Sequence, residues 1–239
     1  MSTRLCAYAI TRARPMELGT ARVVGHRELG LVVADVDPGR FDRVDTWEPQ
    51  DSTLAELVRE HDAVVRAAFR HGPVLPLRFG TLLDGEDAAV RLLELGYERA
   101  LTCLAELDGH REWGVRVRRT GTAVPLPRPE SGLTGTQYLA RRRQKLQVDQ
   151  RSRSDVTAVA ERLRDGLRRY AAGRVDRTRS PGVLVDVAYL VPTADEGAFH
   201  GEIRGFAEEL SGHGATLETT GPWPPYSFTG FELEVTADG

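Results

Sequence analysis

A cluster of prolines near the C-terminus constrains the backbone more than any other feature of this chain. The stretch Gly221–Phe228, GPWPPYSF, has prolines at positions 222, 224 and 225. Each proline fixes its own φ near about −65°, lacks an amide hydrogen and pushes the preceding residue toward extended backbone. Neither a helix nor an ordinary sheet ladder is expected here. Because strand-like patterns lie on both sides, around Leu217 and over 231–235, the stretch predicts a stiff elbow that carries three aromatic rings.

Hydrophobic periodicity divides the rest of the chain into strands and helices. Alternating or continuous apolar runs predict strands at 4–11, 21–26, 29–36, 74–79, 113–117 and 183–191. Apolar spacing of three and four residues predicts helices at 53–70, 84–107, 136–172 and 199–210. The predicted fold class is therefore α+β, with mostly antiparallel sheets and helices packed on one face of each sheet.

The length of 239 residues fits one or two domains. Residues 121–133, GTAVPLPRPESGL, combine prolines and glycines and predict a linker. We therefore expect an N-terminal domain at 1–120 and a C-terminal domain at 134–239, the latter containing the long helix.

Motifs for catalysis or metal binding are missing from the sequence. The chain contains no GxSxG, P-loop, HExxH, CxxC or strand-linked GxGxxG pattern. The two cysteines, Cys6 and Cys103, lie 97 positions apart in apolar segments and are expected to be buried thiols. His61 falls on the apolar face of its helix and is expected to be a buried structural histidine. We therefore expect no enzyme activity, no catalytic residues, no cofactor and no metal.

No apolar stretch of the sequence predicts membrane insertion. The apolar stretch at the N-terminus is too short for a signal peptide, and the longest apolar run, Val183–Pro192, is too short to span a bilayer. The expected location is the cytoplasm.

Positive charge is concentrated in one region. Arg141–Arg179 contains thirteen basic and five acidic residues, a net charge of +8, whereas the whole chain carries −3. One interpretation is a surface for an acidic partner or for a nucleic-acid backbone, the latter in a nucleic-acid-binding regulatory protein that uses this stretch. The other is an exposed helix whose charges keep it soluble or pair with the acidic N-terminal domain. Aromatic residues for base stacking are nearly absent from the stretch, which disfavours binding of single-stranded nucleic acid.

Two long segments resemble the signatures of the gas vesicle protein family GvpF/GvpL. These are HGPVLPLRFGTLL at 71–83 and TGPWPPYSF at 220–228, with the His61 helix before the first. The N-terminal strands CAYAI and GLVVADV are also similar to the family, and the region 121–180 matches least. The resemblance covers essentially the whole chain.

The resemblance implies a fold and a function. It implies two α+β domains of ferredoxin-like character and a non-enzymatic, accessory role in gas vesicles, the gas-filled protein shells that provide buoyancy. Such a protein would bind the hydrophobic shell protein GvpA and other accessory vesicle proteins, prevent GvpA from aggregating and help nucleate the vesicle. It would be cytoplasmic and associated with the gas vesicle, without nucleic acid or lipid membrane as partners.

Two places are candidates for partner binding. Pro76 cannot donate to a ladder, so 74–79 is expected to be an edge or broken strand whose free backbone groups could receive a partner strand. Candidate residues there are Val74, Pro76 and Arg78. In the elbow, Trp223 and Tyr226 either pack on the protein's own core or anchor an apolar partner.

Overall fold

The computed structural model describes residues 4–41, 52–120, 135–178 and 180–229. The predicted linker at 121–133 and the predicted strand at 231–235 lie outside these residues. The chain divides into two compact units, Met1–Glu112 with Pro222–Gly239, and Trp113–Gly221.

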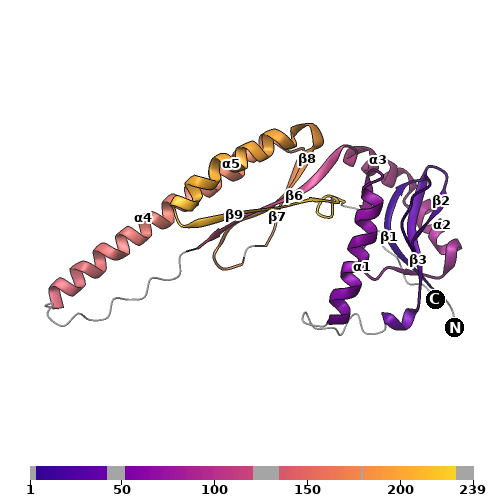
Figure 1. Cartoon of the computed structure of the whole chain (residues 1–239), viewed down its shortest axis with the longest axis horizontal. Helices are drawn as coiled ribbons and strands as arrows, with labels where there is room; N and C mark the ends of the chain where they lie inside the picture. Colours follow the sequence, from indigo (N-terminus) through magenta and orange to yellow (C-terminus); the bar gives the residue numbers. More distant parts are fainter. Residues whose placement is uncertain (1–3, 42–51, 121–134, 179, 230–239) are drawn as a thin grey trace. The chain divides into compact units, whose positions relative to one another are not determined.

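The first unit is built on a five-stranded antiparallel sheet (Figure 1). Its strands are β1 (Arg4–Arg12), β2 (Arg22–His26), β3 (Leu29–Val36), β4 (Val74–Pro76) and β5 (Leu82–Leu83). The strand order is β2-β3-β1-β4, and β5 also pairs with β1. The central pair runs from Arg4 opposite Val36 to Arg12 opposite Leu29, with one register shift between Ala7 and Ala9.

Helices cover the first sheet on both faces. They are α1 (Ser52–Phe69), α2 (Gly85–Leu95) and α3 (Tyr97–Leu107), with a short 3-10 helix at Pro38–Arg40. Val65 and Ala68 of α1 share a core cluster with Cys6 and Tyr8 of β1. Figure 1 shows α1 on one side of the strands and α2 on the other. Because both faces of the sheet are covered, β1 and β3 are buried along nearly their whole lengths.

The second unit has a four-stranded sheet in the order β7-β8-β6-β9. Its elements are β6 (His110–Arg119), α4 (Gly135–Leu167), β7 (Gly173–Asp176), β8 (Val183–Pro192), α5 (Glu196–Gly212) and β9 (Ala215–Trp223), with 3-10 helices at Arg168–Tyr170 and Thr193–Asp195. The core joins Leu163 and Leu167 of α4, Phe199 of α5 and alternate residues of β8 such as Val187 and Tyr189.

The predicted α+β class with two antiparallel sheets is confirmed, and several details differ from the predictions. Helices were expected on one face of each sheet, but they cover both faces of the first sheet (Figure 1). The helix expected at 84–107 is divided at Gly96 into α2 and α3. Strand β9 continues through Pro222 to Trp223, into the stretch where no strand was expected. Because β9 lies at the end of the strand order, the missing amide hydrogen of Pro222 can point away from the ladder.

The two compact units have other boundaries than the domains expected from the sequence. Trp113–Thr120 belongs to the second unit and the elbow from Pro222 onward belongs to the first, whereas the predicted domains were 1–120 and 134–239. The chain therefore enters the second unit on β6 and returns from it on β9.

Candidate partner-binding surface

A buried carboxylate holds the elbow on the first unit. Glu112, at the start of β6, is 1% exposed. Its two oxygens accept hydrogen bonds from the backbone amide of Ser227 at 2.7 Å and from the Ser227 hydroxyl at 2.8 Å. Such charge-assisted bonds are roughly twice as strong as neutral ones. The position of the elbow is thus set by a specific polar contact together with its stiff backbone.

The two candidate aromatic residues of the elbow contact charged side chains of α1. The Arg66 guanidinium carbon lies 3.8 Å from the Trp223 ring centroid, and the Tyr226 hydroxyl donates to Asp62 at 3.0 Å. Arg66 and Asp62 are themselves paired at 2.6 Å. Burial, followed by the charge of Asp62, raises the pKa of Tyr226, so the phenol stays a neutral donor. Both rings are therefore fixed by their own chain, although Tyr226 is still 39% exposed.

His61 is buried in the adjacent position of α1, as predicted. Its ring lies 5.1 Å from Tyr8 and 5.6 Å from Phe79, and it hydrogen-bonds with the backbone of Leu77. Burial lowers the pKa of its imidazole, which favours the neutral ring. Consecutive residues of α1, His61 and Asp62, thus contact the two segments that carry the family resemblance.

The predicted edge strand lies at the end of the sheet but is covered. β4 ends the strand order, which confirms the inference drawn from Pro76. Val74 and Leu75 are both 0% exposed, and Pro76 is also buried. Arg78 follows the strand and is exposed, and its carbonyl accepts two bonds from Thr81 in a turn. A partner strand could add at β4 only if the covering elements moved.

The accessible edge is at the opposite end of the sheet, on β2. The Ala13 amide donates to the Glu28 carbonyl, so Glu28 and every second residue after it in β3 direct their backbone groups toward β1. The residues between them direct their backbone groups toward β2, where they form hydrogen-bonded pairs with Val24 and His26. The backbone groups of Val23 and Gly25 therefore point outward. Gly25 is exposed, and no atom lies within 4 Å of a Cβ placed on it.

A shallow hollow of about 450 Å³ borders this edge. Its lining residues come from the β1–β2 connection and from β2: Ala13, Arg14, Pro15, Met16, Ala21, Arg22, Val23 and Gly25. The sequence predicts a strand at 21–26 but does not indicate that this strand has an open edge. Only the strand order shows which strand is outermost. In the sequence, the one sign of an unusual strand is the glycine at position 25 within the strand pattern.

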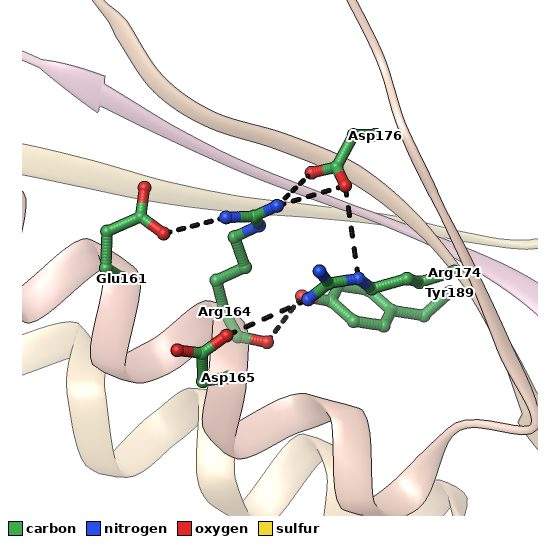
Figure 2. Close-up of polar contacts among 6 residues, drawn as sticks. All are labelled: Glu161, Arg164, Asp165, Arg174, Asp176 and Tyr189. Atoms are coloured by element: carbon green, nitrogen blue, oxygen red, sulfur yellow. Dashed lines mark hydrogen bonds and ion pairs between the residues drawn. The ribbon is translucent and has the colours of Figure 1, made fainter.

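Several arginines in the later part of the basic stretch are paired with carboxylates inside the second unit. Figure 2 shows Arg164 between Glu161 and Asp176, with Nη–Oε2 and Nη–Oδ1 distances of 2.9 Å. Its hydrogen bonds with Glu161 and then Asp176 raise the pKa of Arg164. Tyr189 donates to the Arg164 carbonyl at 3.0 Å, which ties the cluster to β8.

Further pairs continue this pattern along the helix and the next strand. Arg162 pairs with Glu209, Arg169 with Glu202 at 2.8 Å, and Arg174 with Asp165 at 3.8 Å. A nucleic-acid surface over 141–179 would need a continuous stripe of available arginines. These internal pairs interrupt such a stripe after α4 enters the core.

The described residues contain neither a metal-binding cluster nor a helix that could cross a membrane. No group of three or more His, Cys, Asp or Glu side chains is arranged to hold a metal ion in the part of the chain that the structure describes. Among the helices of the same residues, none is long and apolar enough to cross a membrane. Cys6 is buried, which raises the pKa of its thiol to about 11, and Cys103 is half-buried.

The fold and the surface define the class of protein: an α+β protein of two antiparallel-sheet units, with an elbow fixed on the first unit. The family model for gas vesicle synthesis protein GvpL/GvpF matches residues 6–230. The chain therefore belongs to the GvpL/GvpF family of gas vesicle proteins and is involved in gas vesicle formation.

Individual relatives agree with this assignment. The chain is 33% identical over 228 residues to gas vesicle protein L of Streptomyces sp. (strain CB03234), covering 89% of this chain and 84% of that protein. It is 28% identical to gas vesicle protein F2 of Halobacterium salinarum, covering 89% and 82%. The crystal structure of GvpF from Anabaena sp. PCC7120 superposes with a TM-score of 0.72 at 16% identity, covering 97% of this chain and 98% of that one. This structural match supports the fold.

Proposed function

We propose that this chain binds the hydrophobic shell protein GvpA in the cytoplasm, keeps it from aggregating and helps nucleate the gas vesicle, with which it stays associated. It acts by binding and performs no catalysis. Family membership supports the gas vesicle role. The observation that supports a binding role is the open β2 edge beside the hollow in the first unit.

The chemistry of this edge suits an extended apolar segment. Val23 and Gly25 offer outward backbone groups, so a strand of GvpA can add to the sheet by main-chain hydrogen bonds. A residue opposite Gly25 would project its side chain on the face where the glycine leaves open space. Pro15, Met16 and Val23 line the hollow beside it and offer apolar contact. Both contacts cover parts of GvpA that would otherwise drive its aggregation: unpaired backbone groups and apolar side chains.

The residues predicted from sequence then have two different roles. Val74 and Pro76 are buried and position the turn that carries Arg78. Arg78 and the exposed part of Tyr226 are available to GvpA or to other accessory vesicle proteins. Trp223, stacked on Arg66, keeps the elbow in place beside them.

The experiment is co-expression of GvpA with this chain, followed by measurement of soluble GvpA that copurifies with it. Gly25→Pro removes an outward amide hydrogen without touching the β2–β3 ladder, so we expect about a tenfold loss of copurified GvpA, as for one lost backbone hydrogen bond. Gly25→Ala is the matched variant because it keeps the amide and adds only a methyl group in the open space, so the loss with proline beyond the loss with alanine is due to the amide.

Thermal unfolding of each variant checks that the fold is intact. If GvpA stays insoluble with the wild-type chain, the holding role is wrong. If it copurifies equally with wild type and Gly25→Pro, GvpA is bound elsewhere than at β2.

A further inference from the structure

The first part of α4 is an exposed arm that the proposed function does not use. Among the side chains of this 33-residue helix that the structure describes, Val156 is the first that is buried. The preceding residues, 135–154, form a segment of roughly 30 Å at 1.5 Å per residue. Figure 1 shows this segment continuing past α5, which packs along the later part of α4. We call residues 135–154 the α4 arm.

The arm combines apolar and basic residues on one face. Leu139 and Leu146 are 56% and 57% exposed. Arg142 and Arg143 are also exposed and lie three and four positions from each leucine, so all four residues share a helix face. At roughly 100° per residue, this face is rotated by about a quarter turn from the stripe that begins at Val156. Packing against the arm's own unit therefore does not account for the leucines.

Charge is concentrated in the same segment. The arm has six basic residues and one acidic residue, Asp149, a net charge of +5. The rest of the second unit, over 113–134 and 155–221, contains equal numbers of acidic and basic residues. Downstream arginines such as Arg162 and Arg164 are paired with carboxylates, so the unbalanced charge of this unit belongs to the arm.

We propose that the α4 arm binds an acidic amphipathic helix of another protein. Two leucines seven residues apart match one repeat of a two-helix seam, and the arginines between them match acidic residues flanking that seam. A phosphate backbone would use the arginines but leave both leucines in water, so a helix accounts for more of the face. Pairing of two arms from two copies is disfavoured because it places +5 against +5.

The test uses the full chain and synthetic peptides. The probe is a three-heptad peptide with leucine at the seam positions and glutamate beside them; the matched control peptide has lysine in place of each glutamate. A 20-base-pair DNA duplex tests binding of a phosphate backbone. Light scattering of the unliganded chain gives its mass and so tests pairing of two copies. Binding is measured by fluorescence anisotropy at low and high salt.

Three double variants separate the contributions. Arg142→Glu with Arg143→Glu removes the charge, and Leu139→Ser with Leu146→Ser removes the apolar contact. Arg168→Glu with Arg204→Glu makes the same change of net charge at two other exposed positions of the same unit. We expect each arm variant to bind the acidic peptide at least tenfold more weakly, and the control variant to bind as wild type within about twofold.

Specific outcomes would overturn the proposal. One is that the acidic peptide does not bind, or binds the leucine variant as tightly as wild type. Another is that DNA binds more tightly than the peptide in an arginine-dependent manner, which would make the arm a polyanion site. A third is that the chain self-associates through the arm. The four substituted arm residues are exposed, so circular dichroism should show all variants folded. An unfolded variant is replaced by its single substitutions.

Discussion

At the scale of single residues, two neighbouring positions on α1 explain why the elbow needs its particular aromatic residues. Asp62 accepts from Tyr226 and pairs with Arg66, which in turn stacks on Trp223. His61, one position earlier, contacts Phe79 from the other segment that resembles the family. Glu112 completes the attachment by accepting both polar hydrogens of Ser227. The prolines restrict the backbone, and these side chains decide where it is attached.

The Glu112–Ser227 contact leads to a stability prediction. Ser227→Ala removes one donor and should lower the free energy of unfolding by about 0.5–1.5 kcal/mol. Glu112→Gln should cost more, about 1.5–3 kcal/mol, because a buried charged acceptor is lost and an amide group faces the Ser227 donors. Urea unfolding of both single variants and of the double variant gives the coupling energy. Additive effects would show that the two side chains do not act together.

At the scale of elements, α4 is one helix with two different environments. Its later part contributes Val159 and Leu163 to the core of the second unit. Its first part carries exposed leucines and most of the unbalanced charge. A helix that is polar nearly all round is expected to gain little stability from its own chain.

Matched leucine substitutions test this division. Leu163 is 0% exposed, so Leu163→Ala should lower the free energy of unfolding by about 2–5 kcal/mol. Leu146 is 57% exposed, so Leu146→Ala should change it by less than about 0.5 kcal/mol. Chemical denaturation of the two variants gives the comparison, and similar losses for both would mean that the arm is packed in solution.

The elements show what the sequence could and could not predict. Strong periodicity predicted the strands at 4–11, 29–36 and 183–191 to within about one residue of β1, β3 and β8. This succeeds because a strand that buries alternate side chains, or all of them, needs apolar residues at those positions. Strand order and burial of an edge depend on contacts between distant segments. The covering of β4, the exposure of β2 and the return of the elbow to Glu112 therefore appeared only in three dimensions.

At the scale of the whole molecule, the chain carries surfaces of different chemistry on two units. The first unit offers the β2 edge and its hollow, which we assign to GvpA. The second offers the basic α4 arm, which we assign to an acidic helix. An accessory protein with two such surfaces would bring a shell subunit and another vesicle protein onto one chain, which suits a role in nucleation.

Hydrogen exchange of the copurified complex with GvpA shows whether β2 receives an added strand. Amides of Val23 and Gly25 should exchange more slowly in the complex than in the isolated chain, because they donate to that strand. Amides of the α4 arm should exchange at the same rate in both. Unchanged exchange in β2 within a complex that does form would contradict strand addition at β2 and place GvpA on another surface.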